Sequence, residues 1–494
     1  MNAPCRMVVA LLALVPAGPL AGQAPRPRLD SIAAAVLARE HVVGAAVLVR
    51  RGADVLLQRG YGFADLGLEA PVGSETVFHV VGPMLPFTGV AVLQLVEQRK
   101  LSLDDDVARY IPEFPMQGHR VTIRQLLNHT SGIVDYHYLG DPIDATSRQP
   151  KALDEVMALY AGKQWVNEPG TRWDWSISGF QLLVTIVERL SGQSFGEYAR
   201  QHIFEPAGLR STTYCDDFSL VHNLSHAYRR FENGFVPANE NDMAYNADLR
   251  FCSTVGDLDR LWAALRAGRL IRAETFQQMQ TAEGAAIHMS AQDSLAHYGL
   301  ALTINHEDAH VRIGQHGSLF GYSGSLYAFP GDDLTIVVLS NTEGQNAYAV
   351  TRALARAVLG LSPLPVVAPG AESHLADAAV TPEERSSLNG TYVLKLDRLN
   401  PGLHDSYAQY RRTYRVFDEN GRLMIQTLGE GPERLLKQDD GSFGVRSAPR
   451  SRFTFEKAQG KAVKLLMDSQ GFGVPLSGAR VGDGDPVTFH LQRP

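Results

Sequence analysis

The sequence has few cysteines, no long basic run and no apolar run long enough to cross a membrane comfortably. The formal net charge of -7 argues against a nucleic-acid partner. Hydrophobic residues make up 45% of the chain and charged residues 20%, as is ordinary for a soluble globular protein. The 494 residues predict about two or three domains.

The N-terminal segment has the pattern of a secretory signal peptide. A short apolar run, MVVALLALVP, follows Arg6, and small residues surround Ala24. We therefore predict a signal peptide over residues 1–24, with a short N-terminal anchor as the alternative. Gln23 stands where a lipoprotein has its cysteine, and Cys5 precedes the apolar run. We expect a soluble periplasmic or secreted protein without a transmembrane span after cleavage.

Removal of that segment leaves two cysteines, Cys215 and Cys252. In an oxidising compartment two cysteines can pair, and both lie in what the pattern indicates are short connections beside helices. The alternative is two buried free thiols. We favour the disulfide.

Residues 25–361 are expected to form one α/β (α+β) domain. Two alternating segments near residue 50 predict antiparallel strands, and two more lie at 322–330 and 334–341. Between them the pattern is helical, for example in GFQLLVTIVERLSG, which ends at Gly192. Strands at both ends predict an antiparallel sheet closed by the two ends of the domain, flanked by helices, with an all-helical subdomain.

A second unit follows the first. Residues 362–385 are rich in proline, alanine and charge, which predicts a linker. Residues 386–494 then alternate between apolar and polar positions, with turns at ENG, DDG and QG. This pattern predicts a small all-β C-terminal domain, either a barrel or a sandwich.

Several motifs between about residues 30 and 360 carry a family resemblance. The segments LSLDDDVARYIPEFP, VTIRQLLNHTSGIVDY and STVGDLDRLWAAL resemble the serine β-lactamase and penicillin-binding-protein superfamily, in its class C and esterase-like branch. The resemblance implies a β-lactamase/transpeptidase-like fold, hydrolysis of esters, amides or β-lactams, and no cofactor. Members often carry a C-terminal β domain.

The reaction of that family begins with a Ser-x-x-Lys motif at the start of a helix. This spacing places hydroxyl and amine one turn apart, so that the lysine can take the serine proton. The register set by PFTGVAVLQLVE places Gly82 at the serine position and Leu85 at the lysine position. Neither side chain can attack a carbonyl or move a proton.

The two other motifs of the family are also substituted. Trp175 and Ile177 stand at the Tyr-x-Asn positions, and Gln315 stands at the basic position of His-x-Gly, with Gly317 in place. Neighbouring strand residues face opposite ways, so His316 is expected to point away from the cleft if Gln315 points in. The candidate cleft residues are therefore those at the motif positions: Gly82, Leu85, Trp175, Ile177, Gln315, His316 and Gly317.

Other candidate nucleophiles and ligands have structural explanations. GQSFG contains Ser194, which with Glu197 forms an S-x-x-E capping pattern rather than a strand–turn–helix nucleophile. Thr88 is expected to pack inside a helix, and Ser131 to satisfy turn backbone groups. No metal is expected, because the loop residues His129, Asp135 and His137 lack the spacing of a two-histidine helical zinc site. Four aromatic residues could form a stacking platform or simply fill the cleft: Trp173, Trp175, Phe320 and Tyr322.

Three functional hypotheses follow. The first is an exported pseudoenzyme whose cleft binds an envelope-derived peptide, glycan or acyl ligand, or a protein partner. The second is an active hydrolase that uses a different nucleophile, or a water positioned by Gln315 and His316. The third is a binding module that acts through the C-terminal β domain.

Overall fold

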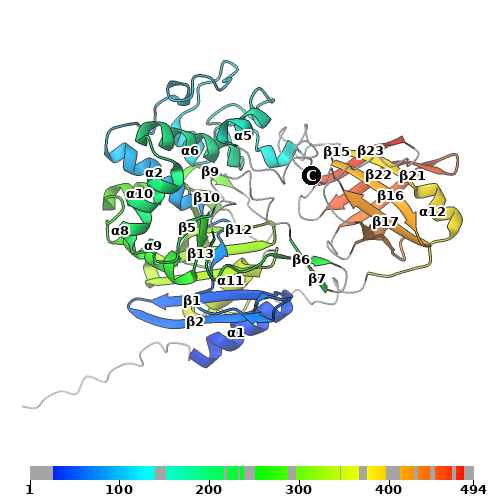
Figure 1. The fold of residues 1–494 in the computed structure, drawn as a ribbon, viewed down its shortest axis with the longest axis horizontal. Helices are drawn as coiled ribbons and strands as arrows, with labels where there is room; N and C mark the ends of the chain where they lie inside the picture. Colours follow the sequence, from blue (N-terminus) through cyan, green and yellow to red (C-terminus); the bar gives the residue numbers. More distant parts are fainter. Residues whose placement is uncertain are drawn as a thin grey trace, which may run out of the picture.

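The computed structural model describes residues 26–139, 152–215, 220–231, 234–238, 251–287, 296–344, 346–365, 375–396, 412–427, 432–445, 451–469 and 474–482. Figure 1 shows a large first body and a smaller body of C-terminal strands beside it. The predicted signal peptide lies outside the described residues. Within those residues, no helix combines the length and apolar character that a bilayer crossing needs.

The first body is built on a nine-stranded sheet. The N-terminal strand β1 (Gly44–Arg51) pairs antiparallel with β14 (Leu334–Ser340), from Ala45 opposite Ser340 to Arg51 opposite Leu334. This pairing confirms that the two ends of the domain close one sheet. Across the sheet the strand order is β3 (Ala70–Pro71), β2 (Asp54–Asp65), β1, β14, β13 (Tyr322–Phe329), β12 (His310–Leu319), β11 (Thr303–Glu307), β10 (Ala296–Tyr298) and β9 (Glu283–Ile287).

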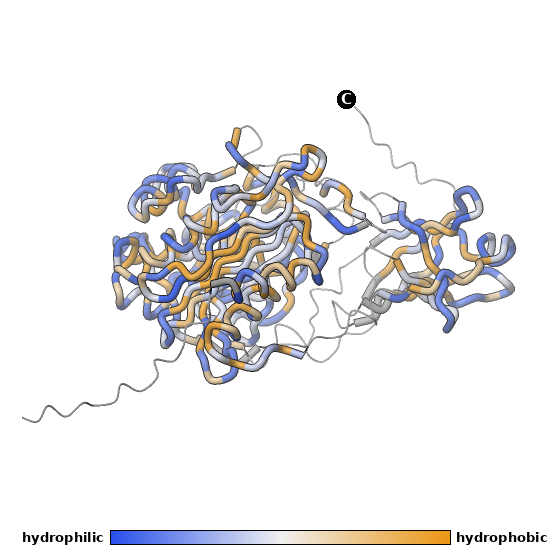
Figure 2. Tube along the Cα trace, turned by 90° about the horizontal axis from the view of Figure 1, so that it is seen from below, coloured by the Kyte–Doolittle hydropathy of each residue, from blue (hydrophilic) through white to orange (hydrophobic). Residues whose placement is uncertain are grey.

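The central strands are hydrophobic along much of their length (Figure 2), and β13 and β14 are buried at every position, so both faces of the sheet are covered. On β14, Ile336 and Val338 pack with helices α1 (Arg26–Arg39) and α11 (Asn346–Leu359). The alternating residues Val337 and Leu339 belong to a second core on the opposite face. That second core also receives α9 (Val255–Arg266) and the helices of the all-helical subdomain.

The helical subdomain is arranged around α6 (Ile177–Ser191). Ser176 caps its start by accepting a hydrogen bond from the Gly179 amide. Gly192 follows its last residue, which confirms the predicted end, and has the left-handed conformation. The other helical elements of this domain are α2 (Leu85–Glu97), η1 (Val107–Arg109), α3 (Ile123–Leu127), η2 (Tyr136–Leu139), α5 (Leu153–Tyr160), α7 (Phe195–Ala199), η3 (Arg200–Phe204), α8 (Glu205–Ala207), α10 (Ala273–Met279) and η5 (Pro330–Asp332).

A small three-stranded sheet lies beside the start of α2. Its order is β4 (Phe78–His79), β8 (Phe251–Ser253) and β5 (Thr213–Tyr214). A separate hairpin joins β6 (Tyr228–Phe231) to β7 (Gly234–Pro237). The small sheet therefore brings together segments that are far apart in the chain.

The C-terminal body is an antiparallel nine-stranded sheet with its own core, which confirms the predicted all-β domain. Its order is β18 (Glu433–Arg434), β17 (Arg422–Thr427), β16 (Arg412–Glu419), β15 (Gly390–Leu396), β23 (Val474–Gly482), β22 (Lys461–Ser469), β21 (Arg452–Ala458), β20 (Phe443–Gly444) and β19 (Leu436–Lys437). That core also takes in the end of α12 (Pro382–Leu388).

Part of the predicted linker packs on this second body. Ala378 forms a β-bridge with Lys437, and the Lys437 ammonium lies 2.7 Å from the Glu384 carboxylate. Leu388, at the end of α12, is buried in the C-terminal core. Residues 375–385 therefore contact the C-terminal sheet rather than merely crossing to it, although the domain limits themselves stay a prediction.

Candidate functional site

The family serine position lies immediately before helix α2. The helix begins at Leu85 after Met84, with Pro86 in its first turn, and the Gly82 carbonyl accepts a hydrogen bond from the Leu85 amide at 3.3 Å. Leu85 is fully buried in the main core of the domain. At the position that the predicted register assigns to the family lysine, the structure therefore has a buried apolar side chain.

The backbone of Gly82 lies directly against strand β12. Gly82 has a φ of +86°, and a Cβ placed on it would lie 2.2 Å from the carbonyl carbon of His316 and 2.3 Å from the Gly317 nitrogen. A Cβ on Gly317 would in turn lie 2.9 Å from the Cα of Gly82. Backbone thus fills the space that a side chain at position 82 would need.

Gln315, at the family histidine position, is fully buried and held on three sides. Its amide nitrogen donates to the Tyr298 hydroxyl at 2.5 Å and to the Ala301 carbonyl at 3.2 Å. Its amide oxygen accepts from the Thr303 hydroxyl at 3.2 Å. Both the nitrogen and the oxygen of the amide are therefore hydrogen-bonded within the protein interior.

His316 faces the opposite side of the sheet. Its ring stacks on Tyr348 of α11, with centroids 4.0 Å apart, and its Nδ1 lies 2.8 Å from the Tyr327 hydroxyl. Gln315 points instead toward Tyr298 on β10. The two side chains therefore cannot position one water molecule together, which removes that version of the active-hydrolase hypothesis.

The opposite wall of the site is formed by the residues before and at the start of α6. Trp175 stacks on His129, with centroids 4.5 Å apart and planes at 25°. The Ser176 amide donates to His129 Nδ1 at 3.1 Å, and the amide of the buried Ile177 donates to the Asp135 carboxylate at 3.0 Å. On this wall the side chains differ from the family pattern, while the backbone amides are firmly bound.

A buried hydrogen-bonded chain links the two walls. His129 Nε2 lies 3.1 Å from the Tyr298 hydroxyl, which also receives the amide of Gln315. Burial lowers the pKa of His129 to about 3, against partial compensation by Asp135 and by the Ser176 amide. Burial also raises the pKa of Tyr298 well above its ordinary value. Both groups are therefore neutral at pH 7.

The other hydroxyls and loop residues near the site have structural roles. Ser194 accepts a hydrogen bond from the Glu197 amide as the N-cap of α7, and Ser131 accepts one from the Ile133 amide. Thr88 is fully buried inside α2. His137 Nδ1 lies 2.9 Å from the Asp135 carboxylate, which also receives the Ile177 amide.

The four aromatic candidates separate into different surroundings. Trp173 and Trp175 both contact the His129 ring, and Phe320 lies 6.4 Å from the His137 ring. Tyr322 is fully buried, and its hydroxyl donates to the Ser225 carbonyl at 2.6 Å. Only the half-buried rings of this group can therefore offer a face to a ligand.

The structure joins Cys215 and Cys252 in a disulfide, with Cα atoms 5.8 Å apart. Sequence reasoning missed the histidine beside them. His79 Nδ1 lies 3.4 Å from Cys252 Sγ, because β4 pairs with β8. Only that strand pairing brings His79 next to residues more than a hundred positions away, so no local motif indicates it.

Comparison with known proteins identifies the framework. The family model described as Beta-lactamase matches residues 29–361. A penicillin-binding protein of Bacillus subtilis (strain 168) is 26% identical over 456 residues, which cover 87% of this chain and 94% of that protein.

Solved structures share the fold. The octameric penicillin-binding protein homologue from Pyrococcus abyssi aligns with a TM-score of 0.62 and 20% identity, over 91% of this chain and 99% of that one. The D-amino acid amidase from Ochrobactrum anthropi SV3, complexed with L-phenylalanine amide, aligns with a TM-score of 0.58 and 18% identity, over 67% of this chain and 98% of that one.

The model match spans more than half of the sequence, and it includes both walls of the site described above. The sheet closed by its two ends and the helical subdomain belong to the same matched region. The chain is therefore a member of the beta-lactamase family, with a serine-hydrolase-like fold.

Proposed function

We propose that this protein is an exported, non-catalytic member of its family that binds an envelope-derived peptide, glycan or acyl ligand. The observation that carries the proposal is the contact between the Gly82 backbone and the backbone of residues 316–317, which leaves no room for a side chain at the serine position. The chain has also replaced the lysine by the buried Leu85.

The chemical consequence is large. Acyl transfer in this family needs a nucleophile and a base one helical turn apart. In a serine protease, removal of one triad member reduces turnover on the order of 10^6-fold, while binding and the oxyanion hole retain some rate. Here both members are absent, and neighbouring Gln315 is bound internally at both ends of its amide. A covalent acyl-enzyme is not expected at this site.

Two half-buried tryptophans support a binding role. Trp173 and Trp175 flank His129, and the indole Nε1 of Trp173 is buried without a hydrogen-bond partner among the described groups. The Nε2 of His137 is likewise buried without a hydrogen-bond partner among the described groups. Aromatic faces with unsatisfied polar atoms suit ligands that combine apolar groups with amides or hydroxyls. The relative and the amidase are likewise named for penicillin and for an amino acid amide.

The loss of chemistry is tested by covalent labelling. The full chain is incubated with a fluorescent penicillin and with an activated ester, and its intact mass is then measured beside that of a family member with an intact Ser-x-x-Lys motif. We expect a stoichiometric adduct on the control protein and an unchanged mass for this chain. A stoichiometric adduct that maps to the site would overturn the non-catalytic assignment.

The binding role is tested separately. The protein is titrated with phenylalanine amide and with a peptidoglycan muropeptide, and binding is measured by tryptophan fluorescence and by calorimetry. We expect saturable binding of at least one probe, at least about fivefold weaker in Trp175→Ala, since loss of a stacked ring costs roughly 1 kcal/mol or more. The control is Trp165→Ala, at a half-buried tryptophan near His119. Equal affinity in both variants, or no binding of either probe, would contradict this role.

A further inference from the structure

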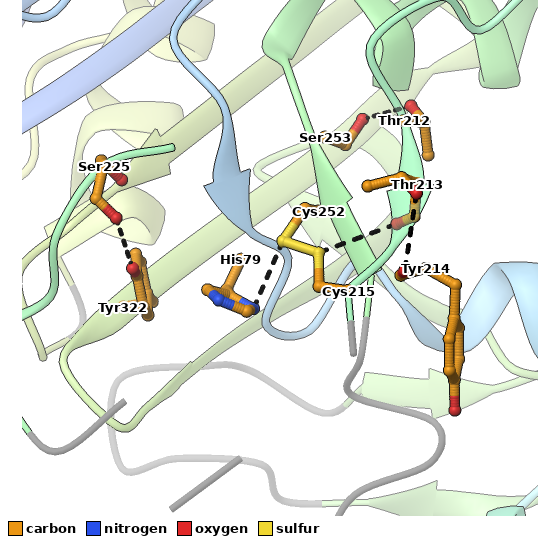
Figure 3. Close-up of a disulfide and its surroundings, with 9 residues drawn as sticks. All are labelled: His79, Thr212, Thr213, Tyr214, Cys215, Ser225, Cys252, Ser253 and Tyr322. Carbon is orange, nitrogen blue, oxygen red and sulfur yellow. Dashed lines mark hydrogen bonds between the residues drawn. A yellow bond between two sulfur atoms is a disulfide. The ribbon is translucent and has the colours of Figure 1, made fainter. Parts of the chain in front are cut away.

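Three potential metal ligands meet at the small sheet beside α2 (Figure 3). His79 on β4 is paired directly with Cys252 on β8, and Cys252 is paired with Thr213 on β5. Cys215 follows that strand immediately. One ligand atom from each of His79, Cys215 and Cys252 lies within 4.8 Å of the other two. Among the residues that the structure describes, these three form the group of histidine, cysteine or acidic side chains whose ligand atoms lie close enough together to hold one metal ion.

The distance between Cys252 and His79 suits coordination of one ion, and the two sulfur atoms, which are bonded to each other here, become available as ligands only after reduction. Ligands at about 2.3 Å for sulfur and about 2.0 Å for nitrogen from a tetrahedral ion lie roughly 3.5 Å from each other. The observed distance from Cys252 Sγ to His79 Nδ1 is 3.4 Å. Two thiolates and one imidazole are also the donor set that thiophilic cations prefer over harder ones.

The surroundings keep the imidazole oriented. The ring lies against Tyr322, with centroids 5.1 Å apart, and the Tyr322 hydroxyl is anchored to the Ser225 carbonyl. Both cysteines are buried, which shields a bound ion from bulk solvent.

We propose that the reduced form of this site binds one thiophilic cation, zinc(II) or copper(I), through Cys215, Cys252 and His79, and that the disulfide is its closed state. Three protein ligands leave a coordination position for an exogenous ligand on zinc, or complete a trigonal site on copper. The site uses none of the substituted motif positions. It therefore stands or falls separately from the non-catalytic function proposed above.

The conversion between the two states is a two-electron reduction. A phosphine attacks one sulfur of the S–S bond, and water supplies the oxygen of the phosphine oxide and the two protons of the resulting thiols. Both thiols then lose their protons to buffer as the cation binds. Oxidation by a disulfide acceptor, which is itself reduced to a dithiol, reverses the process and expels the cation.

The test uses the full chain with Cys5→Ser in every variant, which leaves the two thiols of interest. Phosphine-reduced and oxidised protein are titrated with zinc(II) against a competing chelator, with copper(I) in a second series, and with cobalt(II) as a spectroscopic probe. We expect one equivalent of metal on reduced protein, a thiolate-to-cobalt charge-transfer band, and no binding at the same concentrations to oxidised protein. Circular dichroism checks that each form is folded.

The histidine is tested by a matched pair of variants. His79→Ala is expected to weaken zinc binding at least about tenfold and to shift the cobalt spectrum, while His306→Ala, at an exposed histidine, is expected to change neither. Cys252→Ser should abolish binding. The proposal is overturned if the oxidised protein binds equally well, or if the folded His79→Ala variant keeps the affinity and the spectrum of its parent.

Discussion

The two walls of the candidate site differ in what the structure places at the predicted motif positions. On the sheet side, the backbone of Gly82 lies against Gly317, so the main chain itself occupies the space of the missing side chain. On the helical side, the amides of Ser176 and Ile177 remain bound to His129 and the Asp135 carboxylate, and the change is confined to side chains.

This difference distinguishes two kinds of substitution, one that a reverse substitution can undo and one that it cannot. A substitution within an unchanged backbone leaves a site that a reverse substitution can occupy again. A substitution that lets two backbone segments come together removes the volume itself, because close-packed interiors resist any added atom. The sheet side should therefore resist reversal much more strongly than the helical side.

The largest effect is expected for Gly82→Ala. The new Cβ would lie 2.2 Å from a backbone carbon, which no side-chain rotation can relieve, and the φ of +86° adds strain of its own. We expect more than about 4 kcal/mol of lost stability or failure to fold, measured by urea unfolding. Gly82→Ser should behave likewise, and should not restore acylation even together with Leu85→Lys.

A matched glycine isolates the contact from the backbone strain. Gly118 has a φ of +87° and nothing within 4 Å of an added Cβ. Gly118→Ala should therefore cost only the conformational part, about 1 to 2 kcal/mol. If Gly82→Ala and Gly118→Ala prove equally destabilising, the backbone contact with β12 does not close the site.

A smaller effect is expected for Gln315→Leu. The apolar side chain would leave the buried Ala301 carbonyl without the amide donor that Gln315 provides. An unsatisfied buried group costs about 1 to 3 kcal/mol, so we expect a loss within or slightly above that range in urea unfolding. The exposed Gln277→Leu should stay within about 0.5 kcal/mol of the parent. Equal values for the two would show that the Gln315 amide is not held as described.

Much of the fold could be predicted because its signals are local. Alternation predicted the strands that became β1 and β14, and Gly192 predicted the end of α6, whereas the Ser176 cap at its start was not predicted. The register of the substituted motifs stays a prediction, which rests on the framework segments that neighbour Gly82 and Gln315.

The missing parts depend on contacts between distant segments. The pattern around Gly82 predicts that the family nucleophile is absent, but only the contact of the segment before α2 with β12 shows that a side chain at this position has no room. His79 is likewise an unremarked residue in sequence, and pairing of β4 with β8 makes it a neighbour of Cys252. Residues 375–385 have a linker composition, yet Ala378 joins the C-terminal sheet.

The buried histidine on the helical side predicts a pH dependence. The pKa of His129 falls from 6.5 to about 3 on folding, so the unfolded chain binds more protons between these values. The contribution of neutral His129 to the free energy of unfolding should therefore be fully present above about pH 6.5. It should decline as the pH falls, by up to about 1.4 kcal/mol per pH unit. The slope is measured by urea unfolding from pH 4.5 to 6.5. His129→Gln should reduce it, and the exposed His306→Gln should not; an unchanged slope in His129→Gln would contradict the assignment.

The smallest effect is expected for Trp175→Tyr, which restores the family residue on the wall that kept its backbone. The side chain is half-buried, and a tyrosine ring can keep the stacking on His129 that holds the indole at 4.5 Å. We expect a change below about 1 kcal/mol in urea unfolding, since the substitution preserves an aromatic contact at a solvent-facing position. The same variant should remain unlabelled by penicillin, because its phenol would face a site whose opposite wall is closed by Gly82. A stable, unlabelled Trp175→Tyr beside an unfolded Gly82→Ser would show that the backbone contact, rather than the number of missing polar groups, separates this protein from an active hydrolase. Loss of folding in Trp175→Tyr would instead mean that both walls have become structural.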